Sequence, residues 1–280
     1  MQTEVVRHKS RPRRLGRVIL RVILALLVLA LGYALLWLRP LPATEPALAA
    51  LRSDSAVTVT STTSEISFLP TKPATTGLIF YPGALVDPRA YAYSMHAFAT
   101  KGYAAFIVKM PLNISFLGQE NAEGIIAAHP AISTWAIGGH SLGGVSASTF
   151  AASHREIKGL LLYASYPASN IAPQLQGKEV VSVYGTRDGL ADPASIARSR
   201  TLLPPNTRFV AIEGSIHSFF GDYGLQSGDG QPTISREQAR QQILAASLDF
   251  LSRLAIFHST AKPPSSISPA AICRRASAAR

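Results

Sequence analysis

The sequence has little cysteine and little acidic charge, and both shortages exclude classes of protein. Cys273 is the single cysteine among 280 residues, so the chain can form neither an internal disulfide nor a cysteine-rich metal site. It has 16 Asp and Glu against 27 Lys and Arg, a net charge of +11. Residues 1–21 carry +6 of this charge and residues 258–280 carry +4, which leaves +1 for the body of the chain. A nucleic-acid-binding face needs clustered basic residues on the folded domain, so we expect no nucleic-acid partner.

Long apolar runs are also scarce, and the one that stands out lies near the N-terminus. Val22–Leu38 contains 17 residues without charge, and Val18–Leu20 extends it to about 20, enough to span a bilayer core about 30 Å thick. The basic residues before the run place the N-terminus in the cytoplasm and everything after the run outside. We therefore predict a basic cytoplasmic segment over residues 1–17 and a single-pass transmembrane helix over residues 18–38. A cleaved signal peptide is the alternative, with Ala47-Leu48-Ala49 as its cleavage site.

Beyond residue 38 the chain divides into a linker, one folded domain and a tail. Three prolines favour a linker over residues 39–56. Strands and helices then alternate through residues 57–257, which is typical of a mostly parallel central sheet with helices on both faces. The predicted strands are 57–60, 66–68, 77–81, 103–109, 134–137, 159–164, 180–184 and 207–212, and the predicted helices are 88–100, 117–128, 145–152, 193–203 and 235–257. A composition rich in Ser, Ala, Pro and Arg predicts a disordered basic tail over residues 258–280.

The segment Gly139-His-Ser-Leu-Gly143 carries the main chemical signal. It lies between a predicted strand and a predicted helix, where the G-x-S-x-G pattern forms a sharp turn that exposes the serine hydroxyl. Glycine is needed at both ends because the backbones of the strand and the helix pass too close for a Cβ atom. A serine hydroxyl is a weak nucleophile, so Ser141 requires a general base and a third group to orient that base.

Two later strands supply candidates for these partners. Asp188 follows the seventh predicted strand and His217 follows the eighth, and the carboxyl ends of parallel strands meet at one edge of a sheet. The order Ser141, Asp188, His217 is the order described for α/β-hydrolases. Two other acids are weaker candidates. Asp192 precedes a proline at a helix start and is interpreted as an N-cap, and Glu213 could be a structural acceptor.

An acyl-transfer site also needs donors for the oxyanion. We expect one donor to be the backbone N–H of Leu142, directly after the nucleophile. The second should come from the loop after the third strand, where we assign the N–H of Ala84, with Gly83 as the alternative. His140, the variable position of the turn, is expected at the edge of the pocket.

Together these segments resemble the α/β-hydrolase superfamily, specifically its small dienelactone-hydrolase-like members, also grouped as the α/β-hydrolase-5 domain. The matching motifs are Tyr81-Pro-Gly-Ala-Leu-Val-Asp-Pro88, Gly139-His-Ser-Leu-Gly-Gly144, Gly185-Thr-Arg-Asp188 and His217-Ser-Phe-Phe-Gly-Asp-Tyr-Gly224. The resemblance implies Ser141 as nucleophile, His217 as base and Asp188 as orienting group, with no metal and no cofactor. It does not specify a substrate.

The segment where lipase-like relatives often carry a lid domain is short in this chain. It connects Ala164 to Val180, which predicts an open site. Tyr163, Tyr166 and Pro167 could wall the pocket there, or could simply pack.

We therefore expect a membrane-anchored serine hydrolase that cleaves carboxylic esters, or thioesters, through an acyl-enzyme. The open site favours small or extended acyl groups. A catalytically silent scaffold with the same fold is one alternative, because a fold alone does not establish activity. The complete set of triad residues weighs against it. A lipase that works at the membrane surface is another alternative, favoured by the anchor and disfavoured by the missing lid.

Overall fold

The computed structural model describes residues 12–259, and the chain divides into two compact units between Pro40 and Leu41. The first unit consists of one helix, α1 (Pro12–Trp37). Its stretch Gly16–Tyr33 has a mean hydropathy of 2.0 and is long and apolar enough to cross a membrane. The helix begins earlier than the predicted residue 18, because arginine is a good helix former and proline suits a first helical turn. The predicted tail lies outside the described residues, apart from its first two.

The second unit begins at Leu41, well before the predicted start of the domain at residue 57. Leu41 forms a β-bridge with Val86, and Ala43 forms another with Tyr223. The short helix α2 (Glu45–Ala49) follows, and its Ala47 is completely buried in the core. The residues expected to form a linker are therefore packed on the domain. The prolines do end the apolar helix, but the apolar residues between them still gain by burial.

Eight strands form one sheet in the order β1-β2-β4-β3-β5-β6-β7-β8. Their bounds are β1 (Val57–Ser61), β2 (Glu65–Pro70), β3 (Thr76–Tyr81), β4 (Ala104–Val108), β5 (Thr134–His140), β6 (Ile157–Tyr163), β7 (Glu179–Gly185) and β8 (Arg208–Ile212). The strand β2 pairs antiparallel with β1 and β4, whereas every pair from β4 to β8 is parallel. The expected mostly parallel sheet is confirmed.

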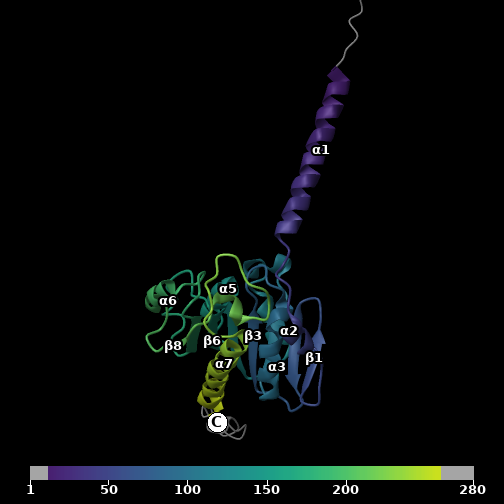
Figure 1. The fold of residues 1–280 in the computed structure, drawn as a ribbon. Coiled ribbons are helices and arrows are strands. Elements are labelled where there is room, and N and C mark those ends of the chain that lie inside the picture. Colours follow the sequence, from purple (N-terminus) through teal and green to yellow (C-terminus); the bar gives the residue numbers. More distant parts are fainter. Residues whose placement is uncertain (1–11, 260–280) are drawn as a thin grey trace, which may run out of the picture. The chain divides into compact units, whose positions relative to one another are not determined.

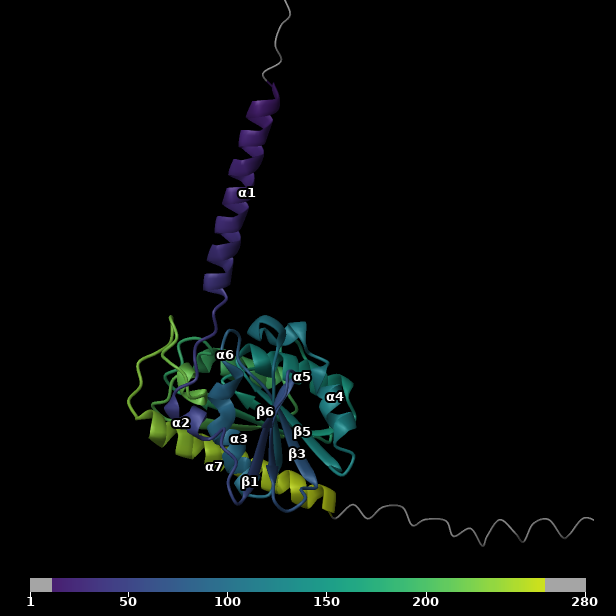
Figure 2. The same ribbon diagram turned by 90° about the vertical axis from the view of Figure 1, so that its right-hand side faces the viewer.

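Helices cover both faces of this sheet, which buries an apolar core on each side. The longer ones are α3 (Ala92–Thr100), α4 (Asn121–Ala128), α5 (Leu142–Ser153), α6 (Pro193–Ser199) and α7 (Arg236–Ser259). Helices α3 and α7 lie on one face and α4 and α5 on the other (Figures 1 and 2). Phe98 and Phe250 belong to the first core, and Ile125 and Phe150 belong to the second.

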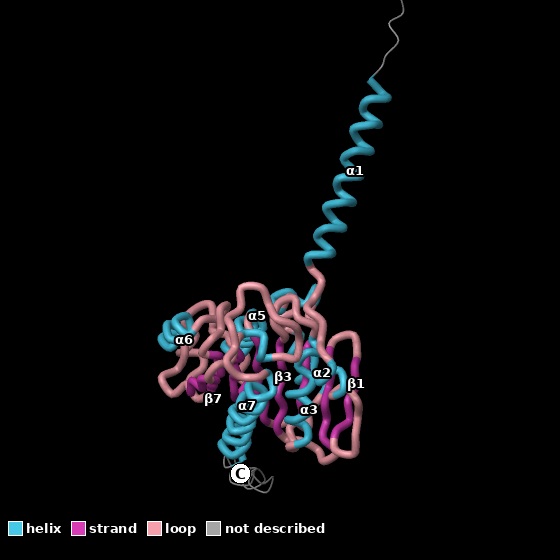
Figure 3. The backbone as a smooth tube through the Cα atoms, viewed as in Figure 1, coloured by secondary structure: helices cyan, strands magenta, loops and turns pink. Residues whose placement is uncertain are grey.

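The strand β5 is longer than predicted, and this extension positions the candidate nucleophile. Sequence analysis ended the strand at residue 137, where the apolar run stops, but Gly138 and Gly139 continue to pair with β3 on one side and β6 on the other. Two flanking parallel strands supply hydrogen-bond partners that side-chain polarity does not reveal. Ser141 therefore follows the strand directly and precedes α5. Loops run along this edge of the sheet, between the strands and the helices (Figure 3).

Candidate active site

Ser141 occupies a strained turn between β5 and α5. Its backbone has φ 52° and ψ −124°, a combination that costs a residue other than glycine about 1–3 kcal/mol. Packing on both sides enforces this turn. A Cβ added to Gly139 would overlap the backbone of Gly143, and one added to Gly143 would overlap the Tyr81 carbonyl. The strain and the glycines agree with the turn that the sequence predicted.

Two hydrogen bonds fix the backbone of Ser141, one from the last residue of β6 and one from the loop that follows it. Its N–H donates to the carbonyl of Tyr163 at 3.0 Å, and its carbonyl accepts from the hydroxyl of Ser165 at 2.6 Å. Ser165 follows Ala164, another residue with positive φ (44°). Sequence analysis missed Ser165, because a single serine after a strand has no distinguishing pattern.

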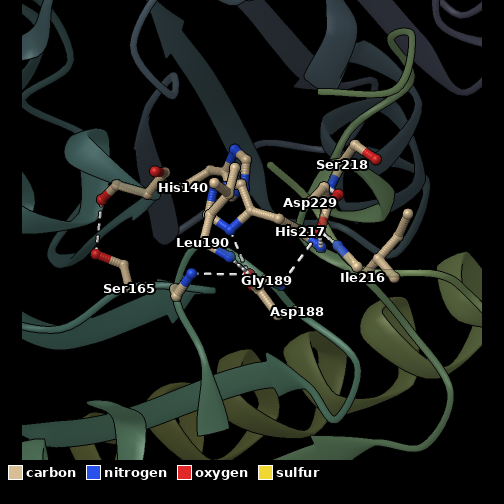
Figure 4. A network of polar contacts seen from close by, with 12 residues as sticks. His140, Ser165, Asp188, Gly189, Leu190, Ile216, His217, Ser218 and Asp229 are labelled. Carbon is tan, nitrogen blue, oxygen red and sulfur yellow. Dashed lines mark hydrogen bonds and ion pairs between the residues drawn. The ribbon is translucent and has the colours of Figure 1, made fainter. Parts of the chain in front are cut away.

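His217 and Asp188 form a buried pair at the ends of the last two strands. The Nδ1 atom of His217 lies 2.8 Å from Oδ2 of Asp188, and both side chains are almost fully buried (Figure 4). The other carboxylate oxygen accepts from the N–H groups of Leu190 and Ala191, each at 2.8 Å. Since an ionised carboxylate can only accept, Nδ1 carries a proton, and in the neutral imidazole Nε2 then bears the lone pair. Nε2 has no hydrogen-bond partner in the described part of the chain.

Ser141 and His217 line the same cavity. Its volume is about 210 Å³, and its walls are Ser141, Leu142, Val145, Ala164, Ser165, Tyr166, Leu190, Ala191 and His217. Asp188 lies behind the histidine and does not reach the cavity. The structure thus brings together all three residues that the sequence singled out. No hydrogen bond joins the Ser141 hydroxyl to His217 among the described residues, and such bonds commonly tighten only when substrate binds.

Asp229 supports the loop that carries His217. Its carboxylate accepts from the N–H groups of His217 at 3.0 Å, Ser218 at 2.8 Å and Gly230 at 2.7 Å, and more weakly from Gly189 at 3.4 Å (Figure 4). One side chain therefore ties the loop of His217 to the loop of Asp188. Sequence analysis missed it, although Gly228-Asp-Gly230 carries a turn signal that could have drawn attention to it.

The two predicted oxyanion donors have free amides. In the described structure, neither the N–H of Leu142 nor that of Ala84 makes a hydrogen bond. The N–H of Gly83, the alternative, donates to the hydroxyl of Tyr91 at 3.0 Å, so it is already committed. The Tyr81 and Pro82 carbonyls pack against Gly143, which brings this loop against the start of α5. Ala84 remains a prediction, because it is absent from the residues that line the cavity.

Behind these loops lies a buried polar network centred on Tyr91. The tyrosine hydroxyl accepts from Gly83 and makes a second hydrogen bond, of 2.9 Å, to Nδ1 of His140. Sequence analysis expected His140 at the pocket edge, but the side chain is fully buried beneath it, with its ring centroid 4.5 Å from that of His217. Burial, together with the neighbouring His217, lowers the pKa of His140 well below 6.5. This histidine is therefore neutral and structural.

Replacing Tyr91 with phenylalanine should weaken the site without removing any group that touches substrate. The change leaves the amide of Gly83 and Nδ1 of His140 buried without a partner, which should lower the free energy of unfolding by about 1–3 kcal/mol. Loosening the loop of Ala84 should also slow ester hydrolysis by roughly 10- to 100-fold. Thermal unfolding and kcat measure the two effects. Tyr103→Phe is the matched control, since its hydroxyl forms no hydrogen bond in the described structure. Unchanged kcat in Tyr91→Phe would show that this network does not support catalysis.

Apart from Tyr166, the other residues that the sequence suggested for the site lie outside the cavity. Asp192 caps α6 by accepting from the N–H of Ser195 at 2.8 Å, which confirms the N-cap prediction. Glu213 accepts from the Thr186 hydroxyl at 3.2 Å. Among the suggested wall residues, Tyr166 lines the cavity, whereas Tyr163 and Pro167 do not. Tyr163 is buried, and its hydroxyl is hydrogen-bonded to that of Ser247 at 2.6 Å.

One group of described residues could offer ligand atoms to a metal ion. Glu120, Glu123 and His154 place such atoms within 4.8 Å of one another. Both glutamates are exposed, and Nε2 of His154 lies 3.1 Å from Glu123 and 3.7 Å from Glu120. The histidine ring stacks on Phe150 at 3.7 Å. These contacts account for the group as a hydrogen-bonded cluster at the surface, and none of its members lines the cavity of Ser141.

Comparison with known proteins places this chain in a family. The profile of the alpha/beta hydrolase family matches residues 77–241. No curated protein sequence matches the chain. Among solved structures, an esterase of Pyrobaculum calidifontis is 14% identical with a TM-score of 0.54, over 74% of this chain and 88% of its own.

Two further solved structures have the same fold. A dienelactone hydrolase-like promiscuous phosphotriesterase from metagenomic libraries is 16% identical with a TM-score of 0.55, over 71% of this chain and 99% of its own. A membrane phospholipase A, described as a bacterial virulence factor, is 14% identical with a TM-score of 0.55, over 86% of this chain and 99% of its own. At such identities the likeness establishes the fold alone.

Proposed function

The chain belongs to the alpha/beta hydrolase family, and on this basis we propose that it is a serine hydrolase that cleaves carboxylic esters, with thioesters as a possible second class. One observation carries the proposal. The Nδ1 atom of His217 is engaged by Asp188, while its unpartnered Nε2 belongs to a residue that lines the same cavity as Ser141. A histidine oriented in this way can accept the proton that a serine must lose to become a nucleophile.

In the proposed reaction, Nε2 of His217 takes the hydroxyl proton of Ser141 while the serine oxygen attacks the carbonyl carbon of the ester. The carbonyl oxygen becomes an oxyanion, and the amides of Leu142 and Ala84 stabilise it. The intermediate then collapses and expels the alcohol, which takes the proton from His217. Water repeats the sequence on the acyl-enzyme and releases the acid. Throughout, Asp188 keeps the proton on Nδ1 and stabilises the transient imidazolium.

The cavity restricts which part of a substrate can be enclosed. Its volume of about 210 Å³ lies below the roughly 300–1,000 Å³ typical of sites that enclose a drug-sized ligand. Leu142, Val145 and Leu190 give it apolar walls. We therefore propose a small acyl group, or an extended one whose far end lies outside the cavity.

We further propose that α1 anchors the protein in a membrane, with the N-terminus in the cytoplasm and the hydrolase domain outside. The residues at the candidate cleavage site and before it pack in the folded domain, which supports an anchor over a cleaved signal peptide. Cleavage after Ala49 would remove the buried Ala47 and the bridges that Leu41 and Ala43 make with the domain. The segment before the cut thus contributes to the folded domain.

Fluorophosphonate labelling of membranes that contain the full chain tests both proposals. We expect the probe to react with one residue, Ser141, and the labelled protein to stay with the membranes after an alkaline carbonate wash. Peptide mapping should recover sequence from before Ala47 in the labelled protein. Ser153→Ala, an exposed serine at the other end of α5, is the control and should label normally. A folded wild-type protein that does not label would favour the silent scaffold. If the wash releases labelled protein whose first residue is Ala50, a cleaved signal peptide is favoured.

A further inference from the structure

Exposed apolar side chains of the folded domain gather at the edge of the sheet that carries the site. Among the described side chains beyond residue 40, the large apolar ones that are exposed are Leu112, Phe116, Leu117, Leu190, Leu225 and Ile256. The first five, called the apolar rim below, follow the carboxyl ends of β4, β7 and β8. Ile256 lies near the end of α7. Single exposed apolar residues are normal, but a group on one side of a molecule indicates an interaction surface.

Hydrogen bonds connect the rim loops to the site. The carbonyl of Asn113 accepts from the N–H of Leu85 at 2.9 Å, and the hydroxyl of Ser115 donates to the carbonyl of Leu142 at 3.0 Å. The loop that carries the first three rim residues therefore contacts both the start of α5 and the loop after β3, residues 82–87, which we call the oxyanion loop. Leu190 lines the catalytic cavity itself. The loop of the first three rim residues and Leu190 thus adjoin the cavity.

The chain also joins the folded domain at this surface. The N–H of Leu41 donates to the carbonyl of Leu85 at 2.7 Å, and the N–H of Thr44 donates to the carbonyl of Asp222 at 2.8 Å. These partners lie on the oxyanion loop and on the loop after His217. The rim residue Leu225 follows shortly after Asp222. The attachment point thus lies beside both the site and the rim.

The tether between the apolar helix and this attachment point is short. The helix α1 ends at Trp37, and only residues 38–40 separate it from Leu41. A fully extended chain of this length spans at most about 14 Å. The headgroup region of a bilayer is roughly 5–8 Å thick on each side. If α1 spans a membrane, the tether keeps the attachment point near the membrane surface, however the domain turns about it.

We propose that the apolar rim docks onto the bilayer that holds α1, and that the site draws its ester from that surface as a lipid acyl ester. The identity of the substrate rests on the proposed hydrolase activity, whereas the docking rests only on the proposed membrane anchor. A cavity of about 210 Å³ encloses the reacting carbonyl and its neighbours but not a long acyl chain, which can extend along the rim. A few apolar side chains bind a bilayer weakly, but the tether raises their effective concentration at its surface.

Fluorescence quenching in vesicles tests the docking. The full chain, with Cys273 replaced by serine, carries a nitrobenzoxadiazole label at Leu225→Cys and sits in phosphatidylcholine vesicles with or without lipid spin-labelled near the headgroup. The matched control is Lys72→Cys, an exposed residue on the loop before β3, at the opposite edge of the sheet. Burial of the rim by about 5–10 Å, as for other interfacial segments, should quench the rim label by roughly half and leave the control unchanged. Equal quenching at both positions, or none at Leu225, would overturn the docking.

Steady-state kinetics test whether the substrate is an ester drawn from the bilayer. The variant Leu112→Ser/Phe116→Ser/Leu225→Ser should hydrolyse a long-chain umbelliferyl ester embedded in vesicles about tenfold or more slowly than the wild type, because three apolar contacts with the bilayer are lost. Its turnover of soluble 4-nitrophenyl acetate should stay within about twofold, since none of the three residues lines the cavity. Ile256→Ser is the control for the loss of an exposed apolar side chain.

The outcomes separate this proposal from the proposed function. If both esters slow equally, or if neither slows, the rim does not deliver substrate and the lipid assignment falls. If the wild type hydrolyses neither ester, the proposed function falls, and the quenching result still decides whether the rim docks.

Discussion

Ester hydrolysis is expected to fall by roughly 10⁴- to 10⁶-fold when Ser141 is replaced by alanine. The variant keeps the cavity and the amide of Leu142 but loses the hydroxyl that we propose as the nucleophile. His217→Ala should cause a loss of similar size, because an unactivated serine hydroxyl is a poor nucleophile. The double variant should be no slower than either single variant, since the two residues act as one unit. The measurement is kcat and KM on one soluble ester for the wild type, the two single variants and the double variant.

A matched serine separates this effect from general damage. Ser153→Ala changes an exposed residue on the same helix as the candidate nucleophile, and its turnover should stay close to the wild type. Losses in Ser141→Ala and His217→Ala that add up in the double variant would contradict a shared nucleophile and base. Turnover that survives in Ser141→Ala would assign the activity to another residue.

Asp188→Asn is expected to lower kcat by about 10⁴-fold while the protein stays folded. The asparagine amide can donate to Nδ1 of His217, which moves the ring proton to Nε2. A protonated Nε2 can no longer accept the proton of Ser141, so the loss falls on the chemical step rather than on substrate binding. The measurement is kcat near neutral pH, with KM expected to change little.

Asp192 is the control for this prediction, because it is a nearby acid with a structural role. Asp192→Ala removes the side chain that caps α6, so it should cost about 1 kcal/mol of stability and leave kcat within about twofold. A greater loss of activity in Asp192→Ala than in Asp188→Asn would reverse the two assignments. Thermal unfolding alongside kcat separates stability from chemistry.

The parts of the fold that could be predicted rest on short stretches of sequence. Alternating strands and helices indicated the mostly parallel sheet, and Asp192 before Pro193 indicated the start of a helix. Such signals are readable because a cap or an apolar run depends on residues only a few positions apart. The strained turn at Ser141 was predictable for the same reason, since its flanking glycines lie within two residues.

The parts that could not be predicted depend on partners far away in the chain. Residues 41–56 resemble a linker because of their prolines, and only the bridges from Leu41 and Ala43 to loops near Val86 and Tyr223 make them part of the domain. The extension of β5 through its two glycines needs strands on both sides. Asp229 is one acid in a glycine-rich loop until three backbone amides converge on it.

The sequence by itself determined the fold class, the apolar N-terminal helix and the choice of Ser141, Asp188 and His217, because each rests on local pattern and on order along the chain. The tertiary structure alone decided that His140 is buried and bonded to Tyr91, that Gly83 has no free amide, and that the N-terminal residues of the domain join it beside the site. It also brought the apolar rim to the edge of the sheet that carries the candidate site. The physical reason is that burial and hydrogen-bond satisfaction depend on which residues meet in space, and loop residues carry no periodic pattern that announces their partners.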